Sequence, residues 1–246
     1  MKKILIPFVV MGCLMLNSCK KSTEEYATVP LSDYYPLQAG KYITYRLDST
    51  VFINFGTVQV TRSYEVKYSV DAPITDNLNR PAWRIIRSIR NTSTDPWVTD
   101  ATFMAVPTNN TLEFIENNLR FVKLHQPVRN GYSWKGHSHI DTYTPSSGLR
   151  YLDDWDYIYD FVGTNETING FNLKTLTVRQ RDEVIGNPID PESYSEVNYG
   201  IEKYAEGIGM VYKSFLHTEY QPGGGSQSGY FVDGSYGIEL TLIDHN

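Results

Sequence analysis

Residues 58–70 read VQVTRSYEVKYSV, and this stretch decides the class of fold. Valine or tyrosine stands at nearly every even position, and polar residues stand at the odd ones. A period of two places alternate side chains on opposite faces of a strand, so the pattern predicts a strand with one buried face and one wet face. Residues 43–53 alternate in the same way, and Asn54-Phe55-Gly56 lies between the two runs as a turn signal. We therefore predict a long hairpin over residues 43–70.

The same alternation recurs through the rest of the chain. Asn117-Asn118 and Asn169-Gly170 indicate further hairpin turns, because Asn and Gly tolerate positive φ. The 19 Tyr favour pleated, half-buried surfaces, and no apolar stripe of helical period exceeds two turns. A sheet of about ten antiparallel strands curls strongly or splits into two layers. We expect an all-β fold made of a single antiparallel, strongly curled sheet or half-barrel, with a β-sandwich as the alternative.

The N-terminal residues predict an export signal. Lys2 and Lys3 precede an uncharged apolar stretch over residues 4–16, which is shorter than the roughly 20 residues of a membrane-spanning helix. That length is typical of a secretory signal peptide. We therefore predict a signal peptide over residues 1–18, a flexible tether over residues 19–30 and a single mainly antiparallel β domain over residues 31–246.

The four residues Leu16-Asn17-Ser18-Cys19 resemble the lipobox of bacterial lipoproteins. The resemblance implies that Cys19 is acylated and becomes the first residue of the mature protein. Two or more acyl chains hold a soluble domain at a bilayer almost permanently. The expected location is the cell envelope, with the outer membrane as the anchoring membrane and its periplasmic or surface side left open.

Cysteine and charge usage exclude several classes of function. Cys13 and Cys19 are the two cysteines, so a mature chain acylated at Cys19 has no thiol for catalysis or for a zinc site. The 28 acidic residues outnumber the 22 basic ones, a balance that disfavours nucleic acid as a partner. We expect no cofactor.

Three phrases of the mature chain resemble uncharacterised cell-envelope lipoproteins of the Bacteroidota. They are Asp33-Tyr34-Tyr35-Pro36-Leu37 with the following Gly40 and Tyr42, the run over residues 201–213, and the ending over residues 236–242. Tyr42 stands where these lipoproteins usually have Trp. The resemblance implies a β domain that follows a lipid tether, and it implies no activity, substrate or catalytic residue.

An aromatic ladder is the main candidate for ligand binding. Trp155, Tyr157, Tyr159 and Phe161 share one face of a predicted strand. On a concave face these rings would hold a hydrophobic ligand, such as an acyl chain. On an open rim they would bind a glycan or an envelope protein, and facing inward they would simply be core. The expected function is therefore non-catalytic binding or scaffolding at the membrane.

The same segment carries the alternative of a glycan hydrolase. Such enzymes use two carboxylates across a cleft, and the candidate acids are Asp153, Asp154, Asp156 and Asp160. The alternative also covers a glycan-binding surface protein that uses residues 153–161.

Three residues near position 139 are weak candidates for a metal site. His137, His139 and Asp141 would share a face if their segment were extended, and two imidazoles with a carboxylate suit zinc. The preceding Gly131 and Gly136 equally favour a loop. The sequence offers no fourth ligand, so we assign no metal.

Overall fold

The computed structural model describes residues 29–246, which form one antiparallel sheet of 13 strands. The strands are β1 (Tyr42–Ile53), β2 (Val58–Thr75), β3 (Pro81–Arg90), β4 (Val98–Pro107), β5 (Thr111–Glu116), β6 (Leu119–His125), β7 (Ser133–Lys135), β8 (Asp156–Ile168), β9 (Phe171–Gly186), β10 (Ser195–Ala205), β11 (Gly209–Gln221), β12 (Tyr230–Phe231) and β13 (Tyr236–His245). A helix α2 (Leu31–Tyr34) precedes them, and a single 3-10 turn η1 (Arg150–Leu152) interrupts the loop before β8. No described helix has the length and apolar character needed to cross a membrane.

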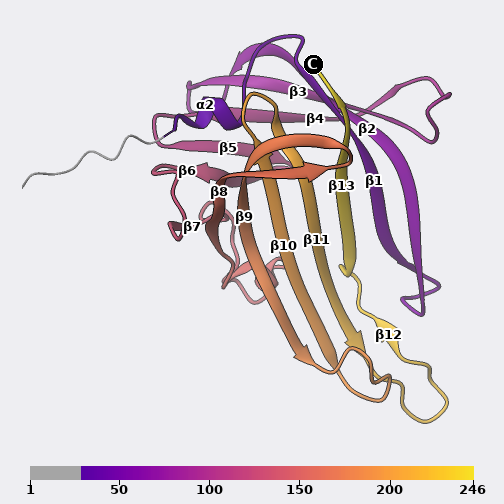
Figure 1. Ribbon diagram of the computed structural model, residues 1–246. Coiled ribbons are helices and arrows are strands. Elements are labelled where there is room, and N and C mark those ends of the chain that lie inside the picture. The colour runs from indigo at the N-terminus through magenta and orange to yellow at the C-terminus, as the bar shows by residue number, and fades with distance from the viewer. Residues whose placement is uncertain (1–28) are drawn as a thin grey trace, which may run out of the picture.

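The sheet curls into a barrel that is nearly closed and has one unsealed seam (Figure 1). Its strand order is β6-β5-β4-β3-β2-β1-β13-β11-β10-β9-β8-β7, and β12 pairs with β11. All pairings are antiparallel, and the right-handed twist of the strands accumulates around the sheet. Short turns join most sequence neighbours, whereas a long loop over residues 136–155 joins β7 to β8. The predicted curled sheet is confirmed, and residues 29–246 do not form the two layers of a sandwich.

The hairpin of β1 and β2 forms as predicted, with Leu47 paired to Tyr64. Its turn contains three consecutive residues of positive φ, at 51° for Asn54, 56° for Phe55 and 81° for Gly56. A Cβ on Gly56 would lie 2.0 Å from the backbone oxygen of Phe231, so this position requires glycine for both conformation and space.

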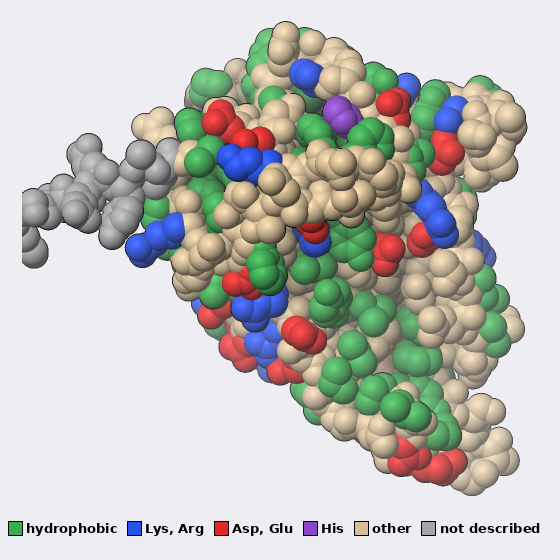
Figure 2. All heavy atoms as spheres, viewed as in Figure 1, with side chains coloured by type: hydrophobic (Ala, Val, Ile, Leu, Met, Phe, Trp, Pro, Cys, Tyr) green, Lys and Arg blue, Asp and Glu red, His purple; other side chains and the backbone are tan. Residues whose placement is uncertain are grey.

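The strand β12 attaches to the long strands through aromatic rings. Phe231 stacks on Phe52 of β1 with 4.2 Å between ring centroids, and its ring lies 5.1 Å from that of Tyr220 of β11. Figure 2 shows hydrophobic side chains gathered over the lower ends of β11 and β13, toward β12.

Side chains bridge the seam between the edge strands β6 and β7. One backbone bond crosses it, from the Val122 N–H to the Gly136 carbonyl at 2.6 Å. The indole N–H of Trp134 donates to the Val122 carbonyl at 2.8 Å. The Tyr159 hydroxyl accepts from the His125 N–H at 2.8 Å and donates to the His125 carbonyl at 2.9 Å. These bonds satisfy groups that a free sheet edge would leave unpaired.

The helix α2 caps one end of the barrel. Tyr34 is fully buried there, and its hydroxyl donates to Glu206 at 3.3 Å. The ring of Tyr35 packs edge-on against Phe114 with 6.3 Å between centroids. The segment Asp33–Leu37 therefore covers the core at this end of the barrel.

A buried ion cluster spans the inside of the barrel between β6 and β10. The Lys123 ammonium lies 2.6 Å from Glu202, whose other oxygen accepts from the Tyr204 hydroxyl at 2.6 Å. Glu116 lies 3.7 Å from Lys123, and Lys213 lies 3.9 Å from Glu202. Burial alone would raise the pKa of Glu202, but Lys123 and Lys213 hold it below its usual value.

A second ionic network ties the turn between β2 and β3 to β5 and β6. Arg80 lies 2.8 Å from Asp76 and 2.7 Å from Glu113, which also pairs with Arg120. Burial opposes the charged form of Asp76, but hydrogen bonds from Arg80 and from the Leu78 N–H lower its pKa to about 2.

Replacing Lys123 by Met should strongly destabilise the fold, because the Glu202 carboxylate then loses its 2.6 Å partner inside the barrel. Breaking a buried pair from one side costs about 3–5 kcal/mol of the free energy of unfolding, measured by urea denaturation. The double variant Lys123→Met/Glu202→Leu removes both charges and should recover much of that loss. A double variant as unstable as the single one would contradict the pairing.

Stability should fall as the pH drops from about 4 to about 2, because Asp76 has a pKa of about 2 in the fold against 3.8 as its ordinary value. The unfolded chain takes up this proton first, so the stabilisation present above pH 4 is lost through that window. In Asp76→Asn the free energy of unfolding should change less steeply between these pH values. Asp182→Asn, at an exposed carboxylate of β9, is the control and should follow the wild type.

Candidate functional site

The aromatic ladder divides between the core and the surface. Trp155, Tyr157 and Tyr159 point inward and are 1%, 2% and 0% exposed, whereas Phe161 is 67% exposed. The pairing of β8 with β9 is irregular between Asp160 and Thr164, and Phe161 has a φ of 54° there, so the alternation of the strand breaks before Phe161. The four rings therefore do not form one surface.

The inner rings border a small cavity rather than a ligand-sized one. Trp155, Tyr157 and Gln180 line a space of about 70 Å³ next to the ion cluster. A cavity for a small-molecule ligand takes several hundred Å³, and 70 Å³ has room for about two water molecules. The Trp155 and Gln180 side-chain N–H groups have no hydrogen-bond partner among the described residues. This cavity is thus too small to hold an acyl chain.

Two of the four acids of residues 153–161 form ion pairs with basic side chains. Asp156 lies 2.9 Å from Lys135, and Asp160 lies 2.9 Å from Arg179. Asp153 has a different partner, since it accepts a hydrogen bond from the Thr142 hydroxyl at 2.8 Å.

His137, His139 and Asp141 do not converge. The segment is a turn rather than a strand, closed by a 2.9 Å bond from the Ile140 N–H to the His137 carbonyl, so the condition for a shared face is not met. His137 is buried, His139 is exposed, and Asp141 accepts backbone N–H bonds from the residues that follow it. No group of three His, Cys, Asp or Glu side chains within residues 29–246 is placed to hold a metal ion.

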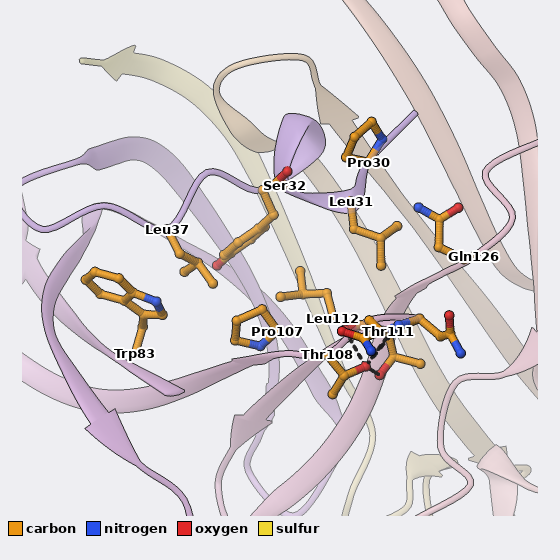
Figure 3. A pocket seen from close by; sticks show the side chains of 13 residues that line it. Pro30, Leu31, Ser32, Leu37, Trp83, Pro107, Thr108, Thr111, Leu112 and Gln126 are labelled. Carbon is orange, nitrogen blue, oxygen red and sulfur yellow. Dashed lines mark hydrogen bonds between the residues drawn. The ribbon is translucent and has the colours of Figure 1, made fainter. Parts of the chain in front are cut away.

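A groove of about 670 Å³ lies at the capped end of the barrel, between α2 and the strand ends of β3, β4 and β5 (Figure 3). Its wall is mainly apolar. Leu31 and Leu37 come from the N-terminal segment, Trp83 from β3, Pro107 from the end of β4 and Leu112 from the start of β5. Leu112 is 2% exposed and closes the bottom, while Leu31, Leu37 and Trp83 are half-buried around it.

The polar edge of the groove is uncharged. Asn109 and Asn110 are exposed in the turn between β4 and β5. Thr108 holds that turn, because its hydroxyl accepts from the Thr111 N–H at 2.9 Å and bonds the Thr111 hydroxyl at 2.8 Å. Gln126 links the edge of the groove to the N-terminal segment, because its side-chain amide donates to the Val29 carbonyl at 3.0 Å. No Asp, Glu, Lys, Arg or His of the described chain lines this groove.

Tyr35 is the titratable residue in the groove wall, and burial raises its pKa far above the usual value. Tyr35 therefore stays protonated at neutral pH. The groove offers contact area and hydrogen bonds from amides, but no group that exchanges a proton near pH 7.

No sequence motif marks this groove as a unit. Its residues lie in four stretches, around positions 30–37, 83, 107–112 and 126, that meet only through the curl of the sheet. Leu37 belongs to the segment Asp33–Leu37, whose resemblance to envelope lipoproteins implies a fold and no binding role.

No family model matches the chain, and no curated protein matches it. Among solved structures, the crystal structure of LprF from Mycobacterium bovis is 11% identical, with 82% of this chain and 85% of that chain covered and a TM-score of 0.20. A TM-score of 0.20 supports no inference about fold or function.

Proposed function

We propose that the protein is a lipid-anchored binding protein of the bacterial cell envelope and that it takes an uncharged amphipathic ligand in the groove beneath α2. The main support for this proposal is the groove itself, which has a volume of about 670 Å³, an apolar wall and an uncharged polar edge. That volume lies in the range of ligand sites, which are mostly apolar with a few placed polar groups.

The residue types favour an acyl chain over a sugar. Leu31, Leu37 and Pro107 supply aliphatic contact area. The two rings of the wall, Tyr35 and Trp83, are half-buried, whereas sugars are bound mainly by flat exposed rings. Each buried CH₂ group contributes about 0.8 kcal/mol. The amides of Asn109 and Asn110 lie at the edge, where they would bond a neutral polar head such as an ester or hydroxyl.

The position of the groove fits a ligand that comes from a membrane. Pro30 and Leu31 line it, and Cys19 is the proposed site of acylation. Cys19 itself lies outside the described residues. A chain of eleven residues spans at most roughly 35–40 Å, so an anchor at Cys19 would keep the groove close to the lipid surface.

We propose no catalytic activity for this site. Acid–base catalysis requires a titratable group within hydrogen-bond reach of the ligand, and the groove wall has only Tyr35, which remains protonated. The experiments below separate anchoring from ligand binding.

Cys19→Ala should abolish lipidation in a bacterial host, because the thiol that carries the acyl group is removed. Metabolic labelling with a tagged fatty acid should mark the wild type and leave the variant unlabelled, and the variant should leave the membrane fraction. Cys13→Ala is the matched control and should keep both label and membrane association. Label and membrane association that survive Cys19→Ala would contradict the anchor.

Leu31→Glu should weaken binding of a fluorescent monoacylglycerol to the purified full-length protein about tenfold or more, because a carboxylate would lose solvation against the apolar wall. Fluorescence titration measures the dissociation constant. Leu78→Glu, at a leucine 63% exposed outside the groove, should bind like the wild type.

Equal dissociation constants for Leu31→Glu and Leu78→Glu would show that the lipid binds outside the groove. A different result would be saturable binding of neutral oligosaccharides that becomes weaker in Leu31→Glu. The groove would then remain the binding site, but the proposal of a lipid ligand would be overturned.

A further inference from the structure

A second cleft, of about 630 Å³, lies apart from the groove under α2. The loop over residues 142–153, which includes η1, forms one side of it. The strands β10 and β11 and the turn at residues 233–234 form the other side. Its lining is mainly polar, in contrast to the apolar wall of the groove.

His217 of β11 is a buried imidazole in the wall of this cleft. It is 8% exposed, and its ring stacks on Tyr151 with 3.7 Å between centroids and 7° between planes. Burial lowers the pKa of His217, although Glu196 opposes this, so the ring is neutral at pH 7. A neutral imidazole has one N–H donor and one nitrogen acceptor.

The hydrogen-bond network fixes which nitrogen is the acceptor. The Asn198 amide nitrogen donates to Glu196 at 2.7 Å and to Glu183 at 3.2 Å, which leaves its carbonyl oxygen to accept. That oxygen lies 2.8 Å from Nδ1 of His217, so Nδ1 carries the proton. The acceptor is therefore Nε2, which has no hydrogen-bond partner among the described residues.

The charges around this acceptor are mainly negative. Asp153, Glu196, Glu219 and Asp233 line the cleft, and Arg150 is the cation in its lining. None of these four carboxylates forms an ion pair within residues 29–246. Elsewhere on the described barrel, acids such as Asp156, Asp160 and Glu183 are paired with a lysine or arginine.

The arrangement of these groups favours an organic cation over a metal ion. The described carboxylates and imidazoles form no group placed to hold a metal ion. A site with a fixed nitrogen acceptor and unpaired carboxylates instead suits a ligand that carries both N–H donors and positive charge. Tyr143, 76% exposed in the lining, adds a ring face for such a cation.

We propose that this cleft binds an organic ammonium cation, with Nε2 of His217 accepting one of its N–H bonds and with Asp233 and Glu219 balancing its charge. The site is separate from the groove under α2 and does not depend on the lipid ligand proposed there.

Spermidine is the probe, added to full-length protein labelled with ¹⁵N at histidine. The proposal expects a saturable shift of the His217 Nε2 resonance, and sorbitol at the same concentration should leave that resonance unchanged. Asp233→Asn should weaken spermidine binding about two- to fivefold, the effect of losing one exposed charge pair. Asp182→Asn, which removes a carboxylate outside the cleft, should leave the affinity unchanged.

His217→Phe keeps a ring against Tyr151 and removes the acceptor, so it should weaken binding about three- to tenfold. If this variant does not fold, Asp233→Asn and the Nε2 shift still decide the result. Spermidine affinity equal in wild type and Asp233→Asn, or an Nε2 resonance unmoved at saturation, would overturn the proposal. So would a shift caused by sorbitol alone.

Discussion

The structure depends on the closure of the seam between β6 and β7. A curled sheet of this length ends in two edges, and each edge presents backbone groups that must be paired or hydrated. Three bonds of Trp134 and Tyr159 to the backbone of β6 take the place of a ladder there. The aromatic residues of β7 and β8 thus hold the ends of the sheet together, and this use requires that they lie inside. That requirement explains why the ladder does not form an open binding surface.

A nearly closed barrel must then fill its interior, and part of this interior is ionic. Lys123 and Glu202 pair inside the barrel, and the Tyr204 hydroxyl donates to Glu202. Breaking such a pair from one side is costly, because the remaining charge loses its nearest partner in a medium of low dielectric constant. Filling the interior in this way moves the available ligand space to the outside, under the cap at one end and beneath the 142–153 loop on the side.

Much of the fold could be predicted from the sequence, because strand alternation and turn chemistry are local. The hairpin over residues 43–70 and the turn at Asn117-Asn118 follow from their own residues, and both Asn have positive φ. The sites could not be predicted in the same way. Trp83 and Leu37 meet across the cap, and His217 receives its orientation from Asn198, which lies 19 positions away on a neighbouring strand. Register and curl create these contacts, and neither can be read from a short motif.

The strands β1 and β13 are neighbours in the sheet although they are far apart in the sequence. Ile43 lies opposite His245, so the first long strand acquires its second neighbour only when the last residues are present. Contacts of such sequence separation are slow to form. Until β13 is in place, β1 and β11 each have an open edge where it will insert. The pairing of the two halves of the sheet through β13 is therefore a late event in folding, and β1 and β11 present unpaired backbone groups until it occurs.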